Sequence, residues 1–340
     1  MSTATLGGLS TAASPPVLQN LKDWPRLRRR DTADPPPCGL DGDLSAVTRW
    51  IRSIGPIETS DIHGIEQAMH QVIDHNQHTV NADRRWLAVN GPAMVGKTQA
   101  VTAAMLRVHD ELLRYPHDPG TGIRAAHIPV IFVGDAGASW PNLLRSVAEF
   151  ASIPVARSYP GTDILRTLRA VLPRLGTHLI VVDDAHMLRR VGVARDLTDN
   201  LKLTLDALPV TFVFAGAGLE HSALLKRSDR SEDAYSAAVQ LAGRMQRWEL
   251  AAFSSTDDAQ RRAWHRRVGA LMTRLELIDG LDTTSLREPT FAANLFGLAD
   301  GLTGLSFELL KDTVIRAISQ HRHPTTDDLL AAAKARGRTR

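Results

Sequence analysis

Short apolar runs alternate with helical stripes along residues 87–214 of this 340-residue chain. The runs lie at 87–89, 127–133, 178–182 and 210–214, and their length is typical of buried strands. Between them, apolar residues recur every three or four positions, as on the buried face of a helix. Because strands alternate with helices, the pattern predicts an α/β fold with a mostly parallel sheet and helices on both faces.

The pattern changes after residue 255, where only helical stripes remain. We therefore predict a core at 44–255 that begins with short helices, followed by a separate helical lid at 256–333. Residues 1–43 are rich in Ser, Thr and Pro without periodicity, which predicts a disordered tail, and 334–340 form a basic C-terminal tail. The first lid helix carries a polar face, predicted to be exposed, that consists of Arg261, Arg262, Arg266 and Arg267.

Composition restricts the class of protein. Hydrophobic residues make up 43% of the chain, enough for a globular core, and no apolar run approaches the roughly 18 residues of a membrane helix. The amino terminus lacks a basic-then-apolar signal segment and Cys38 is the single cysteine, so we expect a cytoplasmic protein without disulfides. A net charge of +3 gives no strong overall field, so any polyanion binding must come from local clusters.

The first apolar run leads directly into Gly-Pro-Ala-Met-Val-Gly-Lys-Thr at 91–98. Two glycines separated by four residues and followed by Lys-Thr have the spacing of a phosphate-binding loop, whose backbone N–H groups surround a polyphosphate. The context fits this interpretation, because a strand precedes the loop and a helical stripe with Val101, Met105 and Val108 follows it. The sequence therefore predicts a nucleotide-binding protein.

Each residue of this loop then has an expected role toward a nucleotide. Lys97 would contact the β- and γ-phosphates, and the Thr98 hydroxyl would bind Mg2+. The helix that begins there would direct its positive amino end toward the phosphates. No Asn-Lys-x-Asp element for guanine follows a later strand, so ATP with Mg2+ is the expected cofactor. The expected nucleotide-binding residues are Gly91, Pro92, Ala93, Met94, Val95, Gly96, Lys97, Thr98 and Gln99.

Two carboxylates, Asp183 and Asp184, follow the third apolar run. Carboxylates at the end of a buried strand are costly unless something binds them. We predict that Asp183 holds the Mg2+ that Thr98 also binds, and that Asp184 polarises the attacking water. Many such enzymes have Glu at the second position, and Asp is one methylene shorter, so we expect slow hydrolysis. The alternative for Asp184 is an acid that stabilises the amino end of the next helix.

The order of these elements, with a helical lid after the sheet, resembles the AAA+ P-loop ATPases. Local matches narrow the resemblance to the transposition ATPases of the TniB and TnsC type, over roughly residues 45–333. The phosphate loop is the most specific of these matches, and the others gain weight from their order along the chain. They are Arg-Trp-Ile at 49–51, Asp-Asp-Ala-His at 183–186, Gln-Leu-Ala-Gly-Arg at 240–244 and Gly-Leu-Thr-Gly at 301–304.

This resemblance implies an ATPase that assembles as a ring or filament on duplex DNA. Such a protein selects or marks a target site and activates a separate DDE-type transposase, with a TniQ-like targeting protein as a further partner. Arg244 then matches the arginine finger that reaches the γ-phosphate of a neighbouring subunit, which makes Lys97, Asp184 and Arg244 the expected catalytic residues. The chain departs from the family because 214–217 supply no polar sensor residue and 304–308 supply no sensor arginine. These departures favour a binding switch over a fast motor.

Basic residues follow the predicted metal-binding strand, where rings of this family place residues near a central channel. They are candidate contacts to DNA phosphates, and solvated surface arginines are the alternative. The candidates are Arg189, Arg190, Arg195 and Lys202.

Three other functions share parts of this pattern. A signalling NTPase of the STAND type often has Asp-Asp after the strand, but normally carries long sensor or repeat domains. A replication-initiator or helicase-loader ATPase shares the core, but usually adds a winged-helix DNA reader, and few residues follow the predicted lid. A nucleotide-dependent scaffold without hydrolysis is the third alternative, and only an assay separates it from an ATPase.

Overall fold

The computed structural model describes residues 36–79, 83–115, 127–134, 139–185, 194–219 and 237–338. Within these ranges, only the backbone is described at 194–198 and 237–239. Most of the predicted N-terminal tail therefore lies outside the described residues. In the described part of the chain, no helix has both the length and the apolar character needed to cross a membrane.

Five parallel strands form the central sheet, in the order β2-β3-β4-β1-β5. Four of them correspond to the predicted apolar runs, and all residues of these four are buried. The fifth, β5, is an edge strand with alternating burial that the apolar pattern did not predict. The bounds are Trp86–Asn90 for β1, Val130–Val133 for β2, Leu179–Val182 for β3, Thr211–Gly216 for β4 and Met245–Glu249 for β5.

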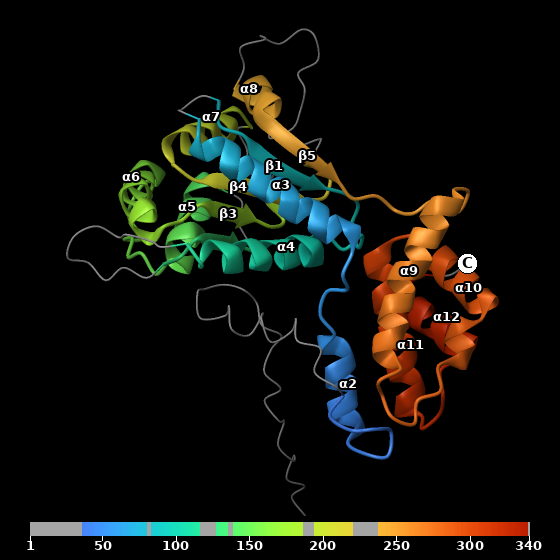
Figure 1. Ribbon diagram of the computed structural model, residues 1–340. Helices are drawn as coiled ribbons and strands as arrows, with labels where there is room; N and C mark the ends of the chain where they lie inside the picture. The colour runs from blue at the N-terminus through green and yellow to red at the C-terminus, as the bar shows by residue number, and fades with distance from the viewer. Residues whose placement is uncertain are drawn as a thin grey trace, which may run out of the picture.

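The helices of the core pack around this sheet (Figure 1). Helices α3 and α4 contact each other and strands β1 and β4, whereas α5 contacts β2, α6 and α7. The helical stripe predicted after the phosphate loop is the buried face of α4. A 3₁₀ turn at Leu172–Leu175 extends α6. The bounds are Ser60–Gln77 for α3, Lys97–Leu112 for α4, Trp140–Phe150 for α5, Gly161–Val171 for α6, Ala194–Ala207 for α7 and Ala237–Arg244 for α8.

The lid forms a second group of helices beside the core (Figure 1). Helix α11 contacts α9, α10 and α12 and is the centre of this group. The buried indole of Trp264 on α9 donates a hydrogen bond of 3.0 Å to the Ser306 hydroxyl on α11. This directional bond fixes how the two helices pair, in addition to their apolar contact. The bounds are Asp258–Leu275 for α9, Pro289–Leu298 for α10, Thr303–Ser319 for α11 and Thr326–Ala335 for α12, with a 3₁₀ turn at Thr284–Arg287.

Helix α2, at Leu44–Ser53, packs against the lid although the sequence division groups it with the core. Its apolar residues Val47 and Ile51 are fully buried. The Lys311 ammonium of α11 donates to the carbonyl of Ile54 just after α2, over 3.1 Å. Helix α2 precedes the core in the chain but packs on the lid, which follows the core. The chain therefore passes between lid and core twice, once after α2 and once after β5.

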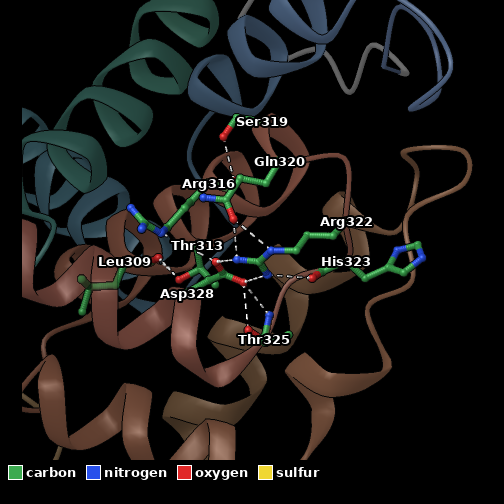
Figure 2. A network of polar contacts seen from close by, with 9 residues as sticks. All are labelled: Leu309, Thr313, Arg316, Ser319, Gln320, Arg322, His323, Thr325 and Asp328. Carbon is green, nitrogen blue, oxygen red and sulfur yellow. Dashed lines mark hydrogen bonds and ion pairs between the residues drawn. The ribbon is translucent and has the colours of Figure 1, made fainter.

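A polar network joins α11 to α12 around the carboxylate of Asp328, whose side chain is 1% exposed (Figure 2). The guanidinium of Arg322 donates to both carboxylate oxygens, and the N–H and hydroxyl of Thr325 donate to it over 3.0 and 2.9 Å. Such charged hydrogen bonds offset the cost of burying a carboxylate. Thr325 and Asp328 also form a capping box that begins α12, a helix absent from the predicted stripes.

One arginine of the predicted polar face on α9 lies at the junction of lid and core. Arg261, Arg262 and Arg266 are exposed as predicted, but the Arg267 side chain is only 15% exposed. Its guanidinium forms an ion pair of 2.7 Å with Asp61 on α3 and lies over the ring of Phe253, 4.8 Å from its centroid. The prediction of exposure is therefore wrong for Arg267, because α3 covers this end of the α9 face.

Candidate nucleotide-binding site

The predicted phosphate loop joins the carboxyl end of β1 to the amino end of α4. The backbone has positive φ at Gly91 (156°), Met94 (63°) and Gly96 (104°), so the loop curves tightly. Gly96 caps α4 in the left-handed conformation, which residues with a side chain resist. Apart from its chain neighbours, no atom of the described residues lies within 4 Å of the point where a Cβ of Gly96 would stand, so the loop is open there.

The Lys97 side chain folds back over this loop. Its ammonium donates to the carbonyls of Gly91 and Pro92, over 2.9 and 2.7 Å. Burial lowers the pKa of Lys97, and the nearby carboxylates of Asp183 and Asp184 raise it. These two carbonyls satisfy the buried ammonium. Phosphate oxygens of a bound nucleotide would compete with them for its hydrogen bonds.

Asp183 lies beside the loop because β1 and β3 end at the same edge of the sheet, with β4 between them. The Asp183 carboxylate is 4% exposed and accepts a hydrogen bond from the Thr98 hydroxyl at the start of α4. Its backbone N–H donates to the Val133 carbonyl on β2 over 2.8 Å, which fixes the strand end. The structure thus brings together Thr98 and Asp183, the two residues predicted to hold Mg2+.

Burial raises the pKa of Asp183, and hydrogen bonds from Thr98 and from the Asp184 N–H oppose this effect. A raised folded-state pKa means that the folded protein binds the proton more tightly than the unfolded chain does. The resulting stabilisation is present at low pH and is lost as the pH rises through the folded-state pKa. At neutral pH, the ionised Asp183 therefore costs stability unless a cation binds it.

We predict that Asp183→Asn raises the melting temperature of the nucleotide-free protein at pH 7.5. An amide of the same shape removes the buried charge, and a gain of about 1 kcal/mol corresponds to roughly 2–4 °C. The difference from wild type should shrink as the pH approaches 4. Differential scanning calorimetry across this range measures it, with the exposed Asp279→Asn as control. A lower melting temperature for Asp183→Asn at pH 7.5 would contradict a destabilising buried charge at this position.

Asp184 is exposed next to the loop, with a left-handed backbone at φ 48°. Its N–H donates to the Asp183 carboxylate over 2.9 Å, so the two acids form one rigid turn at the end of β3. A positive φ in a non-glycine residue is uncommon and strained. The turn separates the two carboxylates, one buried beside Thr98 and one exposed, as two different roles would require.

Arg244 lies far from the phosphate loop of its own chain. It ends α8 at the amino end of β5, whereas the loop follows the carboxyl end of β1. Its guanidinium forms an ion pair of 2.7 Å with Asp206 and lies 5.1 Å from the centroid of the Trp86 ring. Its side chain is 15% exposed. Any contact with a nucleotide would therefore be made on a neighbouring subunit.

The predicted DNA contacts lie largely beyond what the structure describes. Arg189 and Arg190 are outside the described residues, and the side chain of Arg195 is not described. Lys202 is half-buried on α7, between the buried Leu201 and the exposed Leu203. Only the side chain of Lys202 is described among these four residues, so their grouping stays a prediction.

Two polar contacts at the site were not predicted from the sequence. Asn90, the last residue of β1, donates to the Glu249 carboxylate at the end of β5 over 2.9 Å and accepts from the Leu219 N–H over 3.1 Å. The Asn90 side chain therefore joins the start of the loop to the end of β5 and to the segment that follows β4. The second contact comes from the lid, where the N–H of Leu305 on α11 donates to the Met94 carbonyl over 3.0 Å. For the Asn90 contact, the available sequence signal was a polar Asn at the end of an apolar strand.

Taken together, the residues fit a magnesium nucleotide. The loop offers its curved backbone, Lys97 offers a cation held by exchangeable carbonyls, and Thr98 and Asp183 offer two adjacent oxygen ligands. Oxygen ligands from a hydroxyl and a carboxylate, with room for phosphate oxygens, suit Mg2+.

Comparison with known proteins adds information at the level of structure. No family model matches the sequence, and no curated protein matches it. The ORC2 protein of Aeropyrum pernix, in ADPNP-ADP complexes, matches with a TM-score of 0.56 and 15% identity over 83% of this chain and 69% of that one. Cdc6p of Pyrobaculum aerophilum matches with a TM-score of 0.56 and 16% identity, over 82% and 68% of the two chains.

The ORC1 protein of Aeropyrum pernix, in complex with DNA, matches with a TM-score of 0.55 and 16% identity over 84% of this chain and 69% of that one. At these identities the likeness establishes the fold. The sheet order, the loop between β1 and α4, and the helices after β5 agree with it. This chain has the fold of the AAA+ P-loop ATPases, a parallel α/β core followed by a small helical lid.

Proposed function

We propose that this chain binds Mg-ATP at residues 91–99 and hydrolyses it slowly. The observation that carries the proposal is the contact of the Thr98 hydroxyl with the buried Asp183, beside the curved loop. Lys97 would exchange its two carbonyl partners for the β- and γ-phosphates. A bound Mg2+ would neutralise phosphate charge between Thr98 and Asp183. Asp184, exposed beside this pair, would orient the attacking water.

Several features favour slow turnover. The side chain of Asp184 is one methylene shorter than that of the glutamate common at this position. The end of β4 and the residues after it, at 214–217, provide no polar side chain toward the site. The first turn of α11 provides backbone in place of an arginine, because Gly304 and Leu305 lie against the loop. The site therefore suits a switch that binds ATP for long periods.

The finer proposal is an ATP-dependent assembly on duplex DNA that regulates transposition. It would select or mark the target site and activate a separate DDE-type transposase, with a TniQ-like protein as a further partner. The support is the four sequence segments that resemble the TniB and TnsC type, together with the AAA+ fold. A reading frame for a DDE transposase beside this gene would add weight to it.

A replication-initiator or helicase-loader function is the second candidate. The observation that favours it is the likeness to ORC and Cdc6 structures, one of them in complex with DNA. The two candidates share ATP binding and DNA binding, but differ in the partner they act on. Stimulation of strand transfer by a DDE transposase supports the first, and loading of a replicative helicase supports the second.

We expect duplex DNA binding that requires ATP and is largely independent of sequence. If about five phosphates are neutralised, counterion release predicts an affinity loss of several hundredfold for a fourfold rise in salt. Replacing Arg189 and Arg190 together with Ala should lower the salt slope by about two and weaken all duplexes alike. Fluorescence anisotropy over a salt series, with and without a slowly hydrolysed ATP analogue, measures both effects.

The matched control for this test is the pair Arg262→Ala and Arg266→Ala, two exposed arginines on α9. It removes the same charge from the lid and should leave the salt slope unchanged. Binding that does not require nucleotide, or an unchanged slope for the Arg189 and Arg190 variant, would contradict the proposed DNA contacts.

A further inference from the structure

The first turn of helix α11 rests directly on the phosphate loop. The backbone N–H of Leu305 donates to the Met94 carbonyl over 3.0 Å. At the preceding residue, a Cβ added to Gly304 would stand 2.5 Å from that same carbonyl oxygen and 3.1 Å from the backbone nitrogen of Gly96. The contact is thus made by backbone on both sides, and the glycine allows the close approach.

Helix geometry explains why Leu305 is available as a donor. It is the third residue of α11, and the first N–H groups of a helix have no acceptor within the helix. The acceptor in this case comes from the loop of the core. The donated bond also accounts for the unusual backbone of Met94, because a non-glycine residue keeps a positive φ only where its surroundings fix it.

The Met94 carbonyl belongs to the same rigid peptide unit as the N–H of Val95. In a planar trans peptide, the C=O and the N–H point in opposite directions. With the carbonyl held toward α11, the Val95 N–H must point away from the lid. Rotation of this peptide would require the loss of the Leu305 hydrogen bond.

We propose that the first turn of α11 positions a phosphate donor of the loop: by holding the Met94 carbonyl, it presents the Val95 N–H to the polyphosphate of the nucleotide. Gly304 is the positioning residue, since any side chain there would displace the helix from the loop. The inference rests on the proposed nucleotide binding. It makes the affinity for phosphates depend on the docked position of the lid.

The test is Gly304→Ala, measured by competition binding of ADP and of inorganic pyrophosphate, both with Mg2+. The added Cβ meets backbone atoms that cannot rotate away, so the Leu305 bond is lost and the Val95 N–H is released. We expect both ligands to bind roughly ten- to a hundredfold more weakly, the value of one hydrogen bond to a charged group. Equal loss for both is the specific signature, because pyrophosphate has the two phosphates of ADP without its nucleoside.

Gly269→Ala in α9 is the matched control, since no described atom beyond the backbone of its own helix lies within 4 Å of the added Cβ. It should leave both affinities unchanged. If Gly304→Ala folds and binds pyrophosphate as tightly as wild type, the inference is overturned while the proposed nucleotide binding stands. If the wild-type protein binds neither ligand, both the proposed function and the inference are contradicted.

A second measurement uses wild-type protein and does not depend on how the variant folds. Hydrogen exchange of the Leu305 amide should be slow both without nucleotide and with ADP, because its acceptor is the Met94 carbonyl. Exchange as fast as that of an unprotected helix end would overturn the inference.

Discussion

We expect Arg244→Ala to reduce ATP hydrolysis by roughly a thousandfold or more while leaving ATP affinity unchanged. Arg244 lies at one end of the sheet and the phosphate loop begins at the other, so the length of a five-residue strand, about 16 Å, separates them. An arginine at that distance cannot reach its own nucleotide. It can stabilise charge on the transferring phosphate only across a subunit interface. Steady-state phosphate release measures the hydrolysis rate, and calorimetric titration measures the ATP affinity.

Arg244 also has contacts within its own chain, with Asp206 and with the Trp86 ring, so a control must separate these roles. Asp206→Asn removes the ion pair but keeps the arginine, and it should retain most of the hydrolysis. Mixing Arg244→Ala subunits with Asp184→Asn subunits should restore some activity, because interfaces with one intact half of each kind form. If the two variants co-assemble but ATP hydrolysis does not recover at any mixing ratio, Arg244 does not act between subunits.

Most of the core could be predicted because its signals are local. The strands at 87–89 and 178–182 are continuous apolar runs, and the residues after them, Gly91 to Thr98 and Asp183, have spacings dictated by phosphate and metal chemistry. Parallel strands end at one edge of a sheet, so the meeting of Thr98 and Asp183 follows from the order of elements.

Elements with weak local signals were missed. Strand β5 is at the sheet edge, where polar Gln246, Arg247 and Glu249 interrupt the apolar residues, and this gives no apolar run. Helix α12 is short, and its signal was the Thr325 to Asp328 capping box rather than a long stripe. Strand β5 also depends on its pairing with β1, a distant part of the chain, and periodicity does not encode such a contact.

The contacts between lid and core also could not be predicted, because they join residues that are distant in the sequence. Arg267 fits the polar face of α9, yet Asp61 on α3 covers it. Residues 304–308 supply no arginine, and the structure has a backbone contact with the phosphate loop at Gly304 and Leu305. A departure from a family motif was thus visible in the sequence, but its physical meaning required the packing.

The second large effect concerns Lys97. Its ammonium is buried, and this burial lowers its pKa, whereas the carboxylates of Asp183 and Asp184 raise it. Its hydrogen-bond partners are neutral carbonyls, so Lys97→Ala breaks no direct ion pair and the variant should remain folded. It should lose two charge-assisted bonds to phosphates, worth about 1.5–3 kcal/mol each, and hence at least about a hundredfold in affinity for ATP.

Calorimetric titration of Mg-ATP into wild type, Lys97→Ala and Lys334→Ala tests the central claim, that residues 91–98 with Asp183 form a nucleotide site. Lys334 is an exposed lysine on α12 and controls for the loss of one positive charge. The account predicts binding by wild type and Lys334→Ala with equal affinity and binding by Lys97→Ala that is at least about a hundredfold weaker, with all three equally folded by circular dichroism. Equal ATP affinity in wild type and Lys97→Ala would contradict it.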